Sequence, residues 1–168
     1  MGVLITTSRK PSKKTRSFCK DLRAVLPGSE YKNRGKSSLS SVLGLAESLG
    51  KDLVLNVYED NANPSSLAFI KKKGSDWVWG PSLKVKGVRL IREVRNAKYH
   101  QFKDLSLEAG AKEKAFLEGL FGADYFTEGS ELVMKASKDF EEIQFHLDGT
   151  LLGPIIKVSE VMESEKPE

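Results

Sequence analysis

The chain has 168 residues, of which 39% are hydrophobic and 30% charged, and its formal net charge is +4 at pH 7. This composition predicts a globular protein with one domain of ordinary size and a substantial core. No apolar run reaches the roughly 20 residues that a membrane-spanning helix needs, and no secretory signal is evident. The single cysteine excludes an internal disulfide and a cysteine-based zinc cluster, so we expect a cytoplasmic protein.

The positive charge is concentrated in the first part of the chain. Residues 1–73 hold 14 Lys and Arg against 6 Asp and Glu, and residues 74–103 hold 7 against 2. Residues 104–168 hold 6 against 15, so the last part is acidic. Such segregation produces an extended positive potential on one side of a small domain, which favours a polyanionic partner such as nucleic acid.

The first predicted elements are a short apolar strand at residues 3–5 and a helix that ends near Leu26. Pro11 is tolerated in a first helical turn and Ser12 is a possible N-cap, so the helix start could lie a residue either side. At helical spacing, one face of this segment is apolar: Phe18, Leu22, Val25 and Leu26. The opposite face carries only cations: Lys13, Arg16, Lys20 and Arg23.

Polar and basic residues precede this helix, and we interpret them as part of a phosphate-binding surface. They are Thr6, Thr7, Ser8, Arg9 and Lys10. Helix N-termini offer free N–H groups and a partial positive charge, which suit a phosphate. The alternative is an ordinary solvated helix face, although such a face typically mixes positive and negative residues.

A basic glycine turn leads into a second predicted helix at residues 39–49, which Ser37 or Ser38 would cap. Gly35-Lys36-Ser37 resembles a phosphate-binding P-loop, but that motif needs a glycine at position 30, which is Glu. We therefore interpret Arg34 and Lys36 as contacts to an RNA backbone, beside the first helix, rather than as parts of a nucleotide pocket.

The next segments are a buried strand at 52–58, a turn at 59–64 and another strand at 67–70. Lys71, Lys72 and Lys73 follow, close in sequence to both tryptophans. Aromatic rings beside cations could stack on unpaired bases, but Trp77 and Trp79 stand at alternate positions near a hairpin. That spacing is more often a sign of packing.

A strand with one cationic side is predicted at residues 83–92, with a bulge at Gly87. Placed beside the basic helix, this strand would complete a continuous cationic groove. The predicted RNA contacts are Thr7, Ser8, Arg9, Lys10, Lys13, Arg16, Lys20, Arg34, Lys36, Lys71, Lys72, Lys73, Lys84, Lys86 and Arg89.

The second part of the chain repeats the first. The matched segments are 52–55 with 131–134, 67–69 with 143–145, and 80–88 with 153–161. Residues 111–121 are helical by pattern and match the helix at 39–49. We infer two related units, about 1–93 and 96–163, followed by a short tail at 164–168. Only the first unit is expected to carry a leading strand and a basic helix.

These residues resemble a known family, the Brix-domain proteins. The segments that carry the resemblance are Thr6-Thr7-Ser8-Arg9-Lys10-Pro11-Ser12, then Phe18, Leu22, Arg34-Gly35 and Gly80-Pro81-Ser82. The resemblance covers about residues 2–160. It implies an α/β fold with mixed sheets, in which two tandem halves, each like the anticodon-binding domain of certain aminoacyl-tRNA synthetases, form one Brix domain at residues 1–163.

The resemblance also implies a function, because Brix-domain proteins are ribosome-biogenesis factors that bind ribosomal RNA. The implied partners are ribosomal RNA or its precursor, together with ribosome-assembly proteins. Arg9, Lys10, Lys13, Arg16 and the turn at 34–36 would lie at the RNA-facing surface. Longer members carry extensions that are missing here, so the chain resembles the minimal archaeal kind.

Two other classes of function remain as alternatives. An enzyme lacks support, because His100 and His146 stand at unrelated positions and no catalytic or metal-binding spacing is recognisable. We therefore expect no catalytic residue, metal, cofactor, small-molecule substrate or membrane partner. A protein-interaction module whose basic side meets an acidic partner is the second alternative. Sequence-specific DNA binding lacks a helix-turn-helix or zinc pattern.

Overall fold

The computed structural model describes residues 2–163, and the predicted tail at 164–168 lies outside the described residues. The first half contains β1 (Val3–Thr7), α1 (Lys13–Val25), β2 (Glu30–Tyr31), α2 (Leu39–Ser48), β3 (Leu53–Asp60), β4 (Asn63–Lys73) and β5 (Asp76–Arg89). α3 (Ile91–Arg95) lies in the segment that joins the two halves. The second half contains β6 (Ser106–Ala109), α4 (Ala111–Phe121), β7 (Leu132–Ala136), the 3₁₀ turn η1 (Lys138–Phe140), β8 (Glu142–Leu147), β9 (Thr150–Leu151) and β10 (Ile155–Met162).

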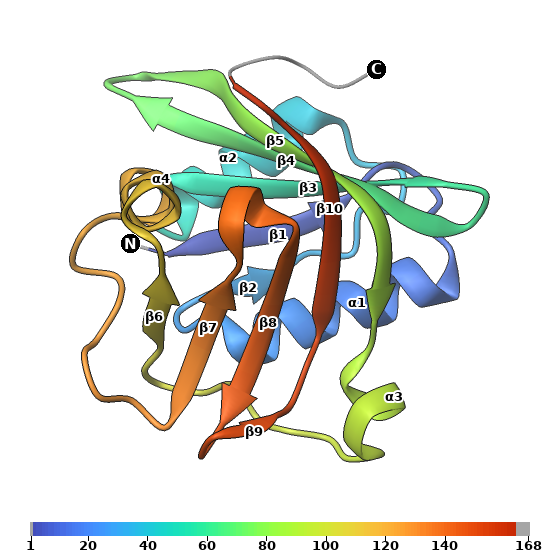
Figure 1. The fold of residues 1–168 in the computed structure, drawn as a ribbon. Helices are drawn as coiled ribbons and strands as arrows, with labels where there is room; N and C mark the ends of the chain where they lie inside the picture. Colours follow the sequence, from blue (N-terminus) through green and yellow to red (C-terminus); the bar gives the residue numbers. More distant parts are fainter. Residues whose placement is uncertain (1, 164–168) are drawn as a thin grey trace.

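All strands of the described chain belong to one mixed sheet (Figure 1). Its order is β2-β1-β3-β4-β5-β10-β8-β7-β6, and β9 pairs with β8. In each half a parallel pair is followed by antiparallel strands: β1 with β3 and then β4 and β5, β6 with β7 and then β8 and β10. The antiparallel pair of β5 and β10 joins the halves. The predicted α/β fold with mixed strand directions is confirmed.

The segments matched in sequence fall on equivalent strands, since β3 corresponds to β7, β4 to β8 and β5 to β10. Two details of the predicted repeat are wrong. The second half does have a leading strand, β6, which is parallel to β7 as β1 is to β3. The helix after it, α4, packs Leu117 and Leu120 into the same core as α1, whereas α2 packs elsewhere. By position and packing, α4 is therefore the counterpart of α1.

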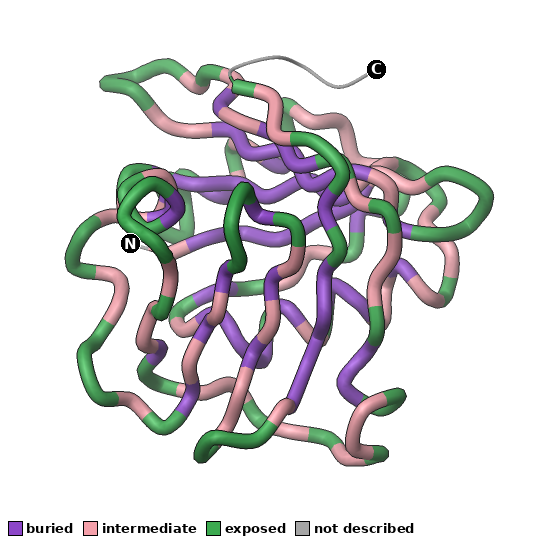
Figure 2. Tube along the Cα trace, viewed as in Figure 1, coloured by how far each residue is buried: buried purple, intermediate pink, exposed green. Residues whose placement is uncertain are grey.

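The main core lies between the two halves and contains apolar residues from both, together with one side of α1 and α4. Figure 2 shows that the buried positions follow the central strands. A smaller cluster fills the space between α2 and the opposite face of the first-half strands: Leu4, Val42, Ala46, Val54 and Ile70. The corresponding face of β7 and β8 carries Lys135, Gln144 and His146. Because these side chains are polar, that face needs no covering helix.

The chain departs from the predicted elements after residue 89. The strand predicted to reach residue 92 ends at Arg89, and α3 begins at Ile91. Two carboxylates favour this helical turn: Glu93 accepts a hydrogen bond from the Leu90 N–H at 2.9 Å, and Asp21 accepts one from the Ile91 N–H at 2.8 Å. The predicted irregularity at Gly87 is present, since the register with β10 shifts between the partners of Gly87 and Val85.

Candidate nucleic-acid interface

One side of α1 is buried and the other is cationic. The helix begins after Ser12, whose hydroxyl accepts a hydrogen bond from the Thr15 N–H, and its buried side includes Phe18, Cys19, Leu22 and Val25. The cationic face of α1 comprises Lys13, Arg16, Lys20 and Arg23; Arg16 is partly exposed and the other three are exposed. Among residues 2–163, no ion pair joins any of these four to a carboxylate. Their positive charge is therefore not neutralised by a neighbouring acid.

The N-terminus of α1 already faces an anion of the protein itself. The Glu59 carboxylate accepts hydrogen bonds from the Ser12 N–H at 3.0 and 3.1 Å and another from the Thr15 hydroxyl. Burial acts to raise the pKa of Glu59, but the hydrogen bonds from Thr15 and Ser12 outweigh it and lower that pKa. A carboxylate thus occupies the position at which we expected a phosphate.

Two predicted RNA contacts lie inside the protein. Thr7 is fully buried, and Arg34 has a relative exposure of only 7%. The Arg34 guanidinium donates hydrogen bonds to the carbonyls of Thr7 and Ser37, both at 2.7 Å. Burial lowers the pKa of Arg34, as does the nearby charge of Arg9. The prediction that Thr7 and Arg34 contact RNA at the surface is therefore wrong. Arg34 instead links the end of β1 to the start of α2 through hydrogen bonds.

The three consecutive lysines lie away from α1, at the end of β4 (Figure 1). Lys71 donates a hydrogen bond from Nζ to the Gly119 carbonyl of α4, at 2.9 Å. Lys72 pairs with Glu47 of α2 at 2.6 Å, with its Nζ 5.4 Å from the centroid of the Trp77 ring. Lys71 and Lys72 thus link the β4–β5 hairpin to α4 and α2, respectively.

Both tryptophans pack against the smaller core cluster between α2 and the sheet. The indole N–H of Trp77 donates a hydrogen bond to Glu47 at 2.9 Å. The packing role favoured for Trp77 and Trp79 from their spacing is therefore what the structure shows, and they belong to the same α2 contact as Lys72.

The cationic side of β5 faces away from α1. Leu83 and Val85 contribute to the core that contains α1, so Lys84 and Lys86, at alternate positions, project to the other face of the sheet. On that face Lys84 lies 4.0 Å from Glu160 of β10. The prediction of one continuous groove formed by α1 and β5 is therefore wrong. Side chains alternate between the two faces of a strand, so the lysines of β5 lie on the face of the sheet opposite to the cations of α1.

Other cations do reach the side of α1, from the segment that joins the two halves. The Gln101 amide donates hydrogen bonds to the carbonyls of Arg23 at 2.9 Å and Ser29 at 2.8 Å, and the Phe102 N–H donates to Ala24 at 2.9 Å. These bonds hold residues 101–102 against the end of α1. As a result Arg92 and Lys98 come close to Lys20 and Arg23, and all four border one cavity.

Sequence reasoning missed Arg92 and Lys98 as members of this surface. The sequence pattern predicts Arg92 at the end of a strand, and Lys98 lies in a segment without periodicity. The available signal was the net positive charge of residues 74–103, which contain 7 Lys and Arg against 2 Asp and Glu.

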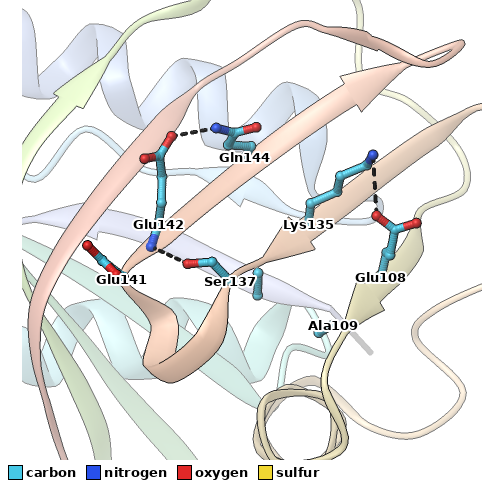
Figure 3. A pocket seen from close by; sticks show the side chains of 8 residues that line it. Glu108, Ala109, Lys135, Ser137, Glu141, Glu142 and Gln144 are labelled. Atoms are coloured by element: carbon cyan, nitrogen blue, oxygen red, sulfur yellow. Dashed lines mark hydrogen bonds and ion pairs between the residues drawn. The ribbon is translucent and has the colours of Figure 1, made fainter.

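The polar face of the second-half strands differs in charge from the surface around α1. A cavity of about 560 Å³ lies on this face. Figure 3 shows the lining side chains, which come from β6, β7, β8 and the turn between β7 and β8. Lys135 and Glu108 form an ion pair there at 3.3 Å, Gln144 donates a hydrogen bond to Glu142, and the Glu142 N–H donates to the Ser137 hydroxyl at 2.8 Å. The lining of this cavity holds three glutamates against one lysine, so its charge does not extend the cationic surface.

The groups that an enzyme could use are scattered. Cys19 is buried in the core, and burial raises the pKa of its thiol, which disfavours the thiolate that a nucleophile needs. Within residues 2–163, no three His, Cys, Asp or Glu side chains are grouped so that they could hold a metal ion. None of the described helices is long and apolar enough to span a membrane.

Comparison with known proteins gives related sequences and structures, although no family model matches the chain. A probable Brix domain-containing ribosomal biogenesis protein from Pyrococcus horikoshii is 35% identical over 129 residues, which are 75% of this chain and 57% of that protein. The chain thus spans about half the length of the curated relatives it matches.

Two solved structures share the fold. A probable ribosomal biogenesis protein from Aeropyrum pernix K1 superposes with a TM-score of 0.80 at 26% identity, covering 96% of this chain and 99% of the other. Mil, an archaeal Imp4-like protein, gives a TM-score of 0.69 at 25% identity, covering 95% of this chain and 99% of the other.

Proposed function

We propose that this chain, which belongs to the Brix-domain family of ribosomal biogenesis proteins, binds ribosomal RNA or its precursor without catalysing a reaction. The observation that carries the proposal is the cationic face of α1, whose four side chains have no acidic partner among residues 2–163. Arg9, Lys10 and Lys36 are exposed as well and add to the positive charge around β1 and α1.

Charge neutralisation would supply most of the affinity. Each RNA phosphate neutralised by Lys or Arg releases condensed counterions, which lowers log K by about 0.7–0.9 for each tenfold rise in salt. Specificity would come from RNA shape and from unpaired loops, because side chains cannot read the deep, narrow major groove of an A-form helix. The face of α1 is suited to such backbone contacts, since its cations repeat along a rigid helix.

The second candidate function is a protein-interaction module with an acidic protein partner. The same cations would serve it, but the acidic residues of the second half, 15 against 6 Lys and Arg in residues 104–168, make this chain a poor general binder of acidic proteins. The acidic residues after position 103 oppose non-specific binding of any polyanion, so productive binding would need a partner that contacts the basic residues before position 104. Structured RNA is a suitable partner of this kind, because it offers a dense array of phosphates that the cations repeated along α1 can neutralise.

The test is RNA binding by fluorescence anisotropy, with fragments of ribosomal RNA from the same organism at several salt concentrations. The variant Lys13→Glu/Lys20→Glu should lose at least tenfold in affinity, since it removes two phosphate contacts and adds two repulsive charges. Lys138→Glu/Lys157→Glu is the matched control, because it changes the net charge equally on exposed residues of the second half.

Equal losses in the two double variants would show a dependence on net charge alone and would contradict binding at α1. Displacement of the RNA by poly-glutamate at equal concentration of charges would favour the acidic protein partner instead. Retention of the circular-dichroism spectrum and melting temperature in each variant would show that the loss does not come from unfolding.

A further inference from the structure

A concave surface lies between α1 and α3, beside the cationic face of α1. Its volume is about 430 Å³, within the range of about 300–1,000 Å³ that small-ligand sites occupy. We call it the α1/α3 groove and define it by six of its lining residues: Ser17, Lys20, Arg23, Arg92, Lys98 and Tyr99. Three separate segments thus contribute side chains to one cavity.

The charge of the α1/α3 groove is strongly positive. Lys20, Arg23, Arg92 and Lys98 are all exposed, and none forms an ion pair with a carboxylate of residues 2–163. The one acid among the lining residues is Asp21, which accepts a hydrogen bond from the Ile91 N–H at 2.8 Å. Asp21 is therefore engaged by the first turn of α3 and leaves a net positive cavity.

A side-chain contact restrains the position of Arg92, and backbone contacts hold the segment after Lys98 against α1. Arg92 donates a hydrogen bond from Nη1 to the Ser17 hydroxyl at 3.2 Å, so its guanidinium lies across the groove towards α1. Lys98 precedes Tyr99 and Gln101, and the Gln101 amide is bonded to the carbonyls at the end of α1. The second wall of the groove is thus held against the first, and Arg92 is already directed across the groove.

An aromatic ring also borders the cavity. Tyr99 is partly exposed and stacks on Phe102, with ring centroids 5.8 Å apart and an interplanar angle of 29°. Its hydroxyl accepts a hydrogen bond from Arg95 Nη1 at 3.4 Å. These contacts fix the plane of the ring. A fixed aromatic ring beside several cations is the combination that holds single-stranded nucleic acid, with the base on the ring and the phosphate on the cations.

We propose that the α1/α3 groove binds one unpaired nucleotide of RNA, with its phosphate between Lys20, Arg23, Arg92 and Lys98 and its base against Tyr99. This proposal rests on the proposed RNA-binding function and adds a place where unpaired and paired RNA are distinguished. A base pair within a helix keeps both faces of each base stacked, so only an extruded or terminal nucleotide can present a free face to the ring. An acidic peptide would meet the cations but gain nothing from the aromatic ring.

The test compares two RNA hairpins of equal length, one fully paired and one with a single bulged nucleotide in the stem. The wild-type protein should bind the bulged hairpin about tenfold more tightly, as expected for one base stacked on an aromatic side chain. Tyr99→Leu should remove this preference and keep the affinity for the paired hairpin. Tyr99→Phe retains the ring and should keep the preference, which separates stacking from a general effect on folding.

The charged wall is tested with Arg92→Glu/Lys98→Glu, against Lys138→Glu/Lys157→Glu as the control of equal charge change. The first variant should bind the bulged hairpin more weakly than the control does. Equal affinity of the wild type for both hairpins, or an undiminished preference in Tyr99→Leu, would overturn the groove proposal while leaving RNA binding by α1 intact. If neither hairpin bound in a salt-dependent manner, the proposed function itself would fail. Displacement of the bulged hairpin by poly-glutamate at equal concentration of charges would assign the groove to acidic peptides.

Discussion

The carboxylate of Glu59 accepts two contacts from the backbone N–H of Ser12, at 3.0 and 3.1 Å, across a sequence separation of 47 residues. Glu59 lies at the end of β3, and Ser12 is the N-cap of α1, so this bond joins the first helix to the β3–β4 hairpin. Ser12 adds a second link, from its hydroxyl to the Ala62 carbonyl at 2.9 Å. The orientation of the cationic face of α1 therefore depends on contacts between its N-cap and the β3–β4 hairpin.

Substitution of Glu59 should destabilise the fold. Glu59→Gln keeps the shape of the side chain but weakens the charge-assisted hydrogen bonds to Ser12 and Thr15, which should lower the free energy of unfolding by about 1–3 kcal/mol. Urea unfolding followed by circular dichroism measures this quantity. Asp60→Asn is the matched control, because Asp60 is exposed and should change stability by less than about 0.5 kcal/mol. Equal effects of the two substitutions would contradict a specific role for Glu59.

The contribution of Glu59 to the free energy of unfolding should decrease as the pH is lowered. Its pKa is lowered in the folded protein, so the folded state holds this proton less tightly than the unfolded state, in which the pKa is about 4.3. The stabilisation is therefore present above the unfolded pKa and is lost as pH falls through the folded pKa. The difference in unfolding free energy between wild type and Glu59→Gln should shrink as pH falls below the unfolded pKa of about 4.3. A difference that grew on acidification would refute this assignment.

Arg34 and Lys36 stand two residues apart and should behave differently. Arg34→Ala removes two hydrogen bonds and leaves the carbonyls of Thr7 and Ser37 without them, which should cost about 2–3 kcal/mol of stability. Lys36 is exposed, and Lys36→Ala should change stability by less than about 0.5 kcal/mol. Thermal melting of both variants checks this difference. A stable Arg34→Ala protein with impaired RNA binding would instead return Arg34 to the RNA-binding surface.

The elements that could be predicted from sequence are those with a clear apolar period. Such spacing correctly predicts the buried face of α1, which includes Phe18 and Leu22. It also predicts the buried strand that corresponds to β3. β6 was missed because its four residues, Ser106–Ala109, are too few for a period to show. α3 was missed because its five residues follow a strand pattern without a break, and the carboxylate of Asp21 that favours its first turn is 70 residues away in sequence.

The interface was harder to predict than the fold, because it depends on which face each element presents. Arg34 looks like a surface residue among Asn33, Gly35 and Lys36, and nothing local shows that two backbone carbonyls will enclose it. For β5, alternation shows that Lys84 and Leu83 point in opposite directions. Only the packing of α1 on the side of Leu83 shows that the lysines face away from the helix.

This separation of faces makes a last prediction about RNA binding. Lys84→Glu/Lys86→Glu changes two exposed cations of β5, on the face opposite to α1, where Glu160 already provides a negative charge. If RNA lies along α1, this variant should lose less than about threefold in affinity, and its salt dependence should match that of the wild type, because no phosphate contact is removed. Lys13→Glu/Lys20→Glu, with the same change in net charge, should instead flatten the plot of log K against log salt by about 1.5. Anisotropy titrations at 50, 100 and 200 mM salt measure both quantities. If the salt dependence of log K fell equally in the two variants, the RNA would have to contact both faces of the sheet. The binding surface would then pass around the sheet edge formed by β1 and β2 and would not be confined to α1.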